Sequence, residues 1–203
     1  MRVIEDLLSR EDTERVLAPH LPALRGFIEE GWSEWHEGIA AYPNFAVGTP
    51  RTRASFVYDL ITPKLEDYFA GVPGVTTTRR RQFLEVMFTD DRIALRVKKF
   101  KGKNLKTSGI PTEQRLEIQA QQVTFDGMSV THLVAGYLPD KFGDQLEVLA
   151  VACSYGERLL WRLDLGCDPV PGSVPVQEVE PSGPPVRSSK IAEEMRQNGA
   201  EGE

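Results

Sequence analysis

Apolar residues recur at helical spacing over most of the first 70 positions. A short helix is predicted over Glu11–Leu17, because Ser9 is a residue type that caps helix N-termini and acidic residues fill the first turn. A second helix is predicted over about Leu21–Ala41, where one apolar set keeps a spacing of three and four: Leu24, Phe27, Ile28, Trp32, Trp35 and Ile39. A third is predicted over Arg53–Phe69, with Pro63 expected to kink or restart it.

After Gly74 the pattern changes to the alternation typical of strands. Thr89-Asp90-Asp91 separates two such segments and predicts a hairpin, and a second hairpin is predicted around Asp140-Lys141-Phe142-Gly143. The elements predicted for this half are strands over 82–88 and 92–100, a short helix over 112–122, strands over 129–138 and 145–153, and a last strand over 159–165.

This order of elements indicates an α+β fold, in which N-terminal helices pack on an antiparallel sheet of about five strands. The predicted organisation is an N-terminal helical segment over 1–50, an α+β core domain over 51–167 and a Pro-rich tail over 168–203. Six prolines fall between Pro169 and Pro185 among Gly, Ser and Glu residues. Such a composition cannot bury a core, so the tail is expected to be disordered or polyproline-like.

Bulk composition narrows the class of protein. No stretch of 18 apolar residues exists, and the N-terminus turns acidic without an apolar signal core, so we expect a cytoplasmic protein with no membrane association. Cys153 and Cys167 do not make a disulfide framework and are expected to be reduced thiols. The net charge of −6 argues against a protein that coats nucleic acid nonspecifically. The oligomeric state has no signature in the sequence.

One region of the chain is strongly basic. Ten of the 24 basic residues lie between Thr76 and Thr107, against three acidic ones, so this stretch carries +7 and the other 171 residues carry −13. A local field of that sign is a candidate site for phosphate, nucleic acid or an acidic protein partner. The predicted binding residues are Arg79, Arg80, Arg81, Arg96, Lys98, Lys99, Lys101, Lys103 and Lys106.

The hypothesis requires that these cations gather into one recess. Arg96 and Lys98 are expected on the same face of one strand, and the lysines of 101–106 lie in a loop that enters a predicted helix. Backbone donors at a helix entrance together with several cations can bind an anion. The alternative interpretation is a charged, solvent-facing hairpin that keeps the protein soluble and resists edge pairing.

No decisive catalytic motif is present. Gly102 and Lys106-Thr107 resemble a phosphate-binding loop poorly, because Leu105 stands where a glycine is required. His132 could lie across from Cys153 as a dyad, although a one-residue shift in register would separate them. A metal-dependent nuclease lacks its acid-x-Lys triplet, but carboxylates are available at Asp59, Glu66, Asp67, Glu85, Asp90 and Asp91. We predict no cofactor and no metal, since the histidines and cysteines lack ligand spacing.

Several segments resemble an uncharacterised bacterial, largely actinobacterial, family. They are Arg53-Ala54-Ser55-Phe56-Val57-Tyr58-Asp59, Leu95-Arg96-Val97-Lys98-Lys99-Phe100, Gly109-Ile110-Pro111-Thr112-Glu113-Gln114, Val134-Ala135-Gly136-Tyr137 and Trp161-Arg162-Leu163. Members often neighbour helix-turn-helix regulators fused to a metallopeptidase-like domain, in modules that look like toxin–antitoxin or phage-repressor systems. Family members favour a histidine where this chain has Tyr58. The resemblance implies a regulatory or phage-defence component and supplies no activity.

The leading hypothesis is therefore a non-enzymatic regulatory or defence-module protein. It would bind nucleic acid or an acidic partner through the basic hairpin and its loop. Two alternatives stay open: a metal-dependent nuclease with an atypical motif, and a purely protein–protein interaction component that uses Trp32, Trp35 and the tail.

Overall fold

A computed structural model of the chain describes residues 7–80, 83–107, 120–121, 124–125 and 128–166. The chain divides into two compact units, Met1–Asp168 and Pro169–Glu203, and the described residues all belong to the first. That unit includes both the segment 1–50 and the core 51–167. The tail predicted from residue 168, and the helix predicted over 112–122 apart from residues 120 and 121, lie outside the description.

Two of the predicted helices form as expected. Helix α2 spans Arg10–Leu17, and the Ser9 side chain caps it by accepting a hydrogen bond of 3.0 Å from the Asp12 backbone N–H. Helix α3 spans Leu21–Ala41 and buries the apolar face predicted from its spacing. A short 3-10 helix, η1, follows at Pro43–Val47.

The third helix, α4, spans Pro50–Phe69 and runs unbroken through Pro63. Of the kink or restart predicted at Pro63, the restart was wrong: Pro63 lies on the exposed side, where water can solvate the backbone carbonyl that loses its donor. The helix also begins three residues earlier than predicted. Thr49 caps it, accepting from the Thr52 N–H at 3.2 Å, and Pro50 occupies the first turn, where its missing N–H costs nothing.

The strands confirm the α+β class and both predicted hairpins. The main sheet has the order β1-β2-β3-β7-β8-β9, with β4 pairing β3 beside this path, and β5 pairs β6 separately. The bounds are β1 Val75–Arg80, β2 Phe83–Phe88, β3 Ile93–Lys101, β4 Lys106–Thr107, β5 Thr124–Phe125, β6 Met128–Ser129, β7 Thr131–Pro139, β8 Leu146–Tyr155 and β9 Arg158–Asp164. Strand β1, which carries Arg79 and Arg80, was not predicted.

The sheet is mixed rather than wholly antiparallel. Strands β1 to β3 form one antiparallel meander and β7 to β9 form another, and β3 pairs with β7 in parallel from Ile93↔Thr131 to Lys99↔Tyr137. A parallel pair needs a long crossover, and the segment from 102 to 130 provides it. The sequence signals of the two hairpins contain no information about how one meander pairs with the other.

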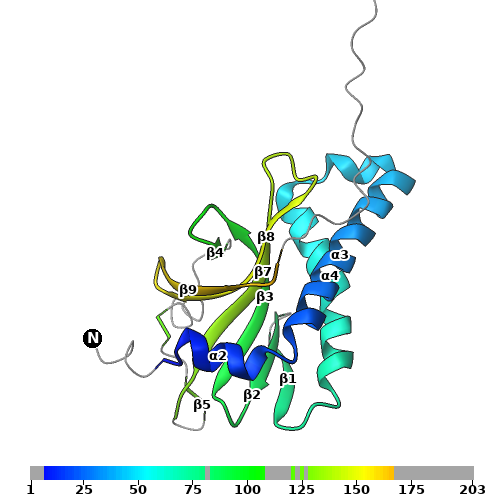
Figure 1. The fold of residues 1–203 in the computed structure, drawn as a ribbon. Helices are drawn as coiled ribbons and strands as arrows, with labels where there is room; N and C mark the ends of the chain where they lie inside the picture. Colours follow the sequence, from blue (N-terminus) through cyan, green and yellow to red (C-terminus); the bar gives the residue numbers. More distant parts are fainter. Residues whose placement is uncertain (1–6, 81–82, 108–119, 122–123, 126–127, 167–203) are drawn as a thin grey trace, which may run out of the picture. The chain divides into compact units, whose positions relative to one another are not determined.

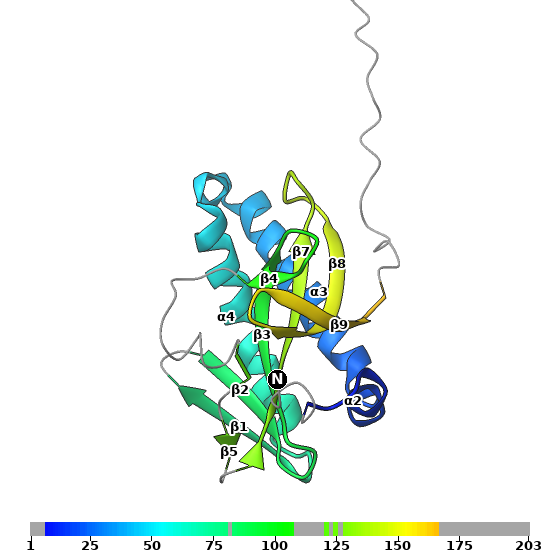
Figure 2. The same ribbon diagram turned by 90° about the vertical axis from the view of Figure 1, so that its left-hand side faces the viewer.

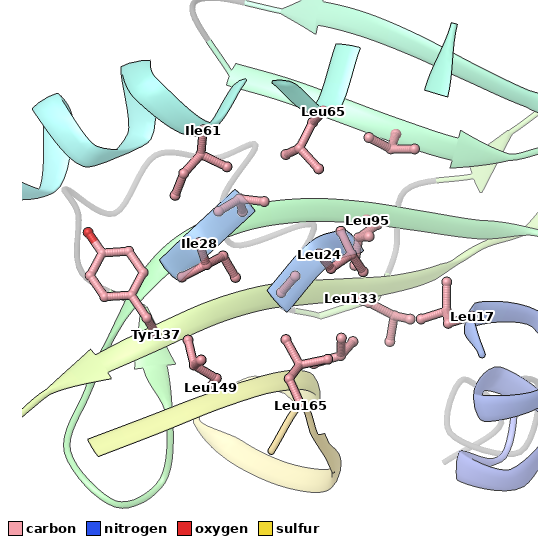
Figure 3. Close-up of a cluster of buried hydrophobic side chains, with 14 of the residues drawn as sticks. Leu17, Leu24, Ile28, Ile61, Leu65, Leu95, Leu133, Tyr137, Leu149 and Leu165 are labelled. Atoms are coloured by element: carbon pink, nitrogen blue, oxygen red, sulfur yellow. The ribbon is translucent and has the colours of Figure 1, made fainter. Parts of the chain in front are cut away.

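The main core lies between the helices and one face of the sheet. In Figure 1, α3 and α4 run side by side along the sheet, and Figure 3 shows Ile28 and Ile61 from these helices above Leu133 and Leu149 from the strands. Leu95 and Val97 of β3 also belong to this cluster. Burial of one complete face fixes the register of each strand, because a shift by one residue would place polar side chains beneath the helices.

A second, smaller cluster covers part of the other face. It is built from Phe100, Leu105, Ala150 and Ala152, and Figure 2 shows β4 and β9 lying in front of the central strands on this side. Gly136 makes the close packing possible, since a Cβ there would overlap the Lys98 backbone carbonyl and meet the Phe100 ring at 2.9 Å. Among the described helices, none is long and apolar enough to cross a lipid bilayer.

Helices α3 and α4 approach closely at Gly31. A Cβ at this position would lie 2.7 Å from the Ile61 Cγ1 atom and 3.4 Å from the Val57 carbonyl oxygen. Gly26 belongs to the same helix, and a Cβ there would meet nothing within 4 Å. Replacing each glycine by alanine therefore distinguishes the effect of packing on stability from the effect of helix propensity.

We predict that Gly31→Ala destabilises the protein by about 1–2 kcal/mol, because overpacking against Ile61 outweighs the gain in helix propensity. Gly26→Ala, the matched control, is expected to stabilise it by about 0.5–1 kcal/mol. Urea unfolding of the two variants measures both values. Equal stabilisation by the two substitutions would show that the helices do not meet at Gly31.

Candidate functional site

The nine predicted binding residues do not gather in one recess. Side chains alternate along β3, so Arg96 and Lys98 share the face of Phe100, whereas Lys99 shares the helix-covered face of Val97. Arg80 occupies the register position opposite Phe83, and Arg81 lies outside the described residues. The expectation of a single basic surface on the hairpin is therefore not met.

Arg96 is committed to an ion pair within the sheet. Its Nη2 and Nε atoms lie 2.6 and 2.8 Å from the Glu85 Oε2 atom, and the two side chains are only 12% and 10% exposed. Two residues further along each of the strands β2 and β3, the Lys98 ammonium lies 4.7 Å from the centre of the Phe83 ring. Glu85 thus offsets the charge that was expected to meet an anion.

Two further predicted cations are neutralised on the surface. Arg79 binds Glu66 of α4 in a bidentate pair, with N···O distances of 2.5 and 2.6 Å, and this contact raises the pKa of Arg79 and lowers that of Glu66. The Lys106 ammonium lies 2.8 Å from the Glu157 carboxylate. Lys103 is exposed in the turn between β3 and β4.

The structure instead assembles a cationic cavity from three elements and a loop. It measures about 250 Å³ and lies where β3 and β7 leave the sheet; we call it the β3–β7 recess. Its cationic lining residues are Arg53 of α4, Lys99 and Lys101 of β3, and Lys141 of the β7–β8 loop. None of the four forms an ion pair with any residue that the structure describes.

Arg53 is held firmly at the inner side of this recess. Its Nη1 atom donates a 2.8 Å hydrogen bond to the Gly143 carbonyl, and its guanidinium carbon lies 6.0 Å from the centre of the Trp32 ring. Gly143 has a φ of 79°, and the guanidinium occupies the space that a Cβ would need. The Nε atom of Arg53 is buried without a hydrogen-bond partner.

Asp140 is the acidic residue that lines the recess, and backbone groups of its own loop occupy its carboxylate. Burial alone would raise its pKa, yet the pKa is lowered because the carboxylate accepts hydrogen bonds from the backbone N–H groups of Asp144, Gln145 and Gly143, and because the charge of Arg53 acts in the same direction. These bonds shape the loop that presents Lys141. Asp140 therefore influences Arg53 through its charge but forms no direct ion pair with a cation of the recess among the described residues.

The charges inside the recess repel one another. Lys99 is half-buried, and burial lowers its pKa, which the positive charge of Arg53 lowers further. Burial also lowers the pKa of His36 on α3, with Arg53 adding to the effect and Asp144 and Asp140 opposing it. Half-buried cations close to each other are costly unless an anion joins them, so the arrangement favours anion binding.

Unpartnered polar atoms lie beneath the same cations. Tyr137 is 2% exposed, its hydroxyl has no hydrogen-bond partner, and burial raises its pKa although the charge of Arg53 acts in the opposite direction. His36 Nε2 is likewise buried without a partner. Tyr137 neighbours Lys99 in the sheet, and Figure 3 shows its side chain on the helix side of β7.

One exposed aromatic side chain lies on the rim of the recess. Phe142 is 76% exposed, and the Lys141 ammonium lies 5.9 Å from its ring centre. Because flat apolar faces beside cations are features of single-strand binding sites, this ring can stack against a base.

A second cavity of about 250 Å³ lies beside the turn between β2 and β3. Arg15, His20, Asp90 and Asp91 line it, and the His20 ring is held by a 3.1 Å contact between its Nδ1 atom and the Tyr68 hydroxyl. No group of three or more metal-binding side chains exists among the described residues. Of the carboxylates considered for a nuclease, Glu66 and Glu85 are engaged by arginines.

The dyad predicted between His132 and Cys153 was wrong. Cys153 lies opposite Leu133 in the register of β7 and β8, so it faces the helices while His132 faces the other way. This is the one-residue shift that separates side chains across a sheet. The Gln121 side chain bridges the two strands near this point, donating to the carbonyls of His132 and Ser154 at 2.9 Å each.

Comparison with known proteins adds no further constraint: no family model, no curated protein and no solved structure matches the chain. Of the four cations that line the recess, the sequence analysis named Lys99 and Lys101 and missed the other two. Arg53 and Lys141 lie outside the basic stretch, and no pattern along the chain connects them with Lys99. Only the return of the β7–β8 loop to the start of α4 brings them together.

We predict that Glu85→Ala destabilises the protein by about 3 kcal/mol, because it leaves the charge of Arg96 nearly buried and unpaired. Glu157→Ala removes the exposed partner of Lys106 and is expected to change stability by no more than about 0.5 kcal/mol. Urea unfolding compares the two. Similar values for both would mean that Arg96 is solvated and available for a ligand.

We also predict that Cys153 resists thiol reagents in the folded protein. Burial raises its pKa to about 12, against roughly 8.5 for an unperturbed thiol. The folded state therefore holds the Cys153 thiol in its neutral form. The stabilisation that this gives is complete below about pH 8.5 and falls as pH rises from about 8.5 to 12, because the unfolded chain loses the proton first. Reaction with a disulfide reagent, followed at pH 8 in a Cys167→Ser background, is expected only after denaturation. Rapid labelling of the native protein would contradict the buried position.

Proposed function

We propose that the protein is a non-enzymatic regulatory or defence-module component that binds nucleic acid at the β3–β7 recess. The observation that carries this proposal is the convergence of Arg53, Lys99, Lys101 and Lys141 on one cavity, none of them in an ion pair with a residue that the structure describes. The regulatory context comes from the family resemblance of the sequence. Within the basic stretch, Lys99 and Lys101 contact the ligand. Arg79, Arg96 and Lys106 do not, because acids neutralise them.

The cations around the recess favour a ligand with high negative charge density. The chain carries −6 overall, so a weakly charged acidic surface would be repelled by most of the molecule. A phosphate inside the recess instead meets several cations at short range in a partly desolvated site. Lys99 and Arg53 gain most, since an anion between them offsets their mutual repulsion.

The exposed ring on the rim favours nucleic acid over an acidic protein. Phe142 presents an exposed ring at the rim, with Lys141 beside it. Bases stack on such rings whatever their sequence, while an acidic peptide offers carboxylates without flat partners. A single recess with a few cations predicts modest affinity and a shallow dependence on salt.

We predict that Lys101→Ala with Lys141→Ala lowers the affinity for a fluorescein-labelled oligothymidylate at least tenfold. The slope of log K against log[salt] should become shallower by about 0.7 for each lost phosphate contact. Both lysines are exposed, so the fold should be retained. Fluorescence anisotropy between 50 and 200 mM NaCl measures both quantities.

The matched control is Lys106→Ala, which removes an exposed lysine that Glu157 already neutralises. Its affinity and salt slope should equal those of the wild type. Failure of the wild-type protein to bind the strand at 50 mM NaCl would refute the proposed function. Cleavage of the strand in the presence of Mg²⁺ would refute its non-enzymatic part.

A further inference from the structure

We propose that the β3–β7 recess recognises a terminal phosphate monoester on a nucleotide, with Phe142 stacking on the attached base. The inference rests on the proposed function and deepens it by naming the chemical group that enters the recess. Two sources share this chemistry: a free nucleoside monophosphate and the phosphorylated end of a single strand.

The size of the recess suits one phosphate group better than a run of backbone. Its volume is about 250 Å³. Cavities for larger organic ligands generally exceed about 300 Å³. A phosphate with part of its sugar fits, whereas successive phosphates of a continuous strand would need a groove.

The charge is concentrated at one point instead of extending along a track. Arg79 pairs with Glu66, Arg96 with Glu85 and Lys106 with Glu157, so acids offset these three cations. An internal phosphodiester carries a single charge, but a terminal monoester carries about −1.5 to −2 near neutral pH. Four cations around one cavity therefore favour the monoester.

The cations that line the recess supply donors for the additional oxygen of a monoester. A monoester presents three acceptor oxygens, and an internal diester presents two unbridged ones. Lys99, Lys101 and Lys141 each carry an ammonium group with three donors. Arg53 already spends one N–H on Gly143, which fixes the direction of the remaining ones.

The rim supplies the surface for the base. Phe142 follows Lys141 directly in the loop, so a nucleotide whose phosphate contacts the lysine would bring its base within reach of the ring. Phe83 offers a matched comparison in another part of the fold. It is 45% exposed and also lies beneath a lysine, Lys98, but it does not line the recess.

The test compares three fluorescein-labelled single strands of identical sequence, with a 5′-phosphate, a 3′-phosphate or neither, by anisotropy at 100 mM NaCl. We expect at least one phosphorylated strand to bind ten or more times tighter than the unphosphorylated strand. Competition by AMP distinguishes the sources: equal affinity indicates a free nucleotide, and weaker competition indicates a strand end.

Phe142→Ala should weaken binding of AMP at least fivefold while leaving inhibition by inorganic phosphate unchanged, and Phe83→Ala should affect neither. Equal binding of phosphorylated and unphosphorylated strands, still sensitive to Lys101→Ala with Lys141→Ala, would overturn this inference and leave the proposed function standing. Absence of binding by all three strands and by AMP would overturn both.

Discussion

The burial of one face of the sheet beneath α3 and α4 is the constraint on which the placement of charge in this protein depends. The helices present an apolar surface, so β3 must direct Leu95 and Val97 toward them. Strand geometry then places Arg96 and Lys98 on the opposite face. Lys99 returns to the helix side near the end of the strand, where α4 begins and Arg53 is available.

The alternation of side chains along β3 places some cations next to carboxylates and others in the recess, where no ion pair forms among the described residues. Arg96 lies in the interior of the sheet surface, where an unpaired charge would be costly, and Glu85 on the neighbouring strand offsets it. Arg79 lies beneath the edge of α4 and reaches Glu66. In the recess the corresponding acid is diverted, because the Asp140 carboxylate holds three backbone N–H groups of its own loop.

The recess is thus a place where local structure prevents charge neutralisation. Gly143 accepts the Arg53 guanidinium against its backbone, Asp140 shapes the loop, and Lys141 and Phe142 project from it. Repulsion between Lys99 and Arg53 is retained in the folded state and offset by packing elsewhere. Such retained strain at a cavity is more readily explained by a bound anion than by stability of the fold.

Local signals in the sequence determined the elements: Ser9 caps α2, the apolar spacing defines α3, and the turn at Asp90-Asp91 defines the β2–β3 hairpin. They also determined that basic residues concentrate between 76 and 107. Only the tertiary structure decided the parallel pairing of β3 with β7, the separation of His132 from Cys153, and the partners of each cation. The reason is physical. Helix periodicity and turn chemistry act between residues a few positions apart, whereas Arg53, Lys99 and Lys141 meet through long-range packing that no local pattern encodes.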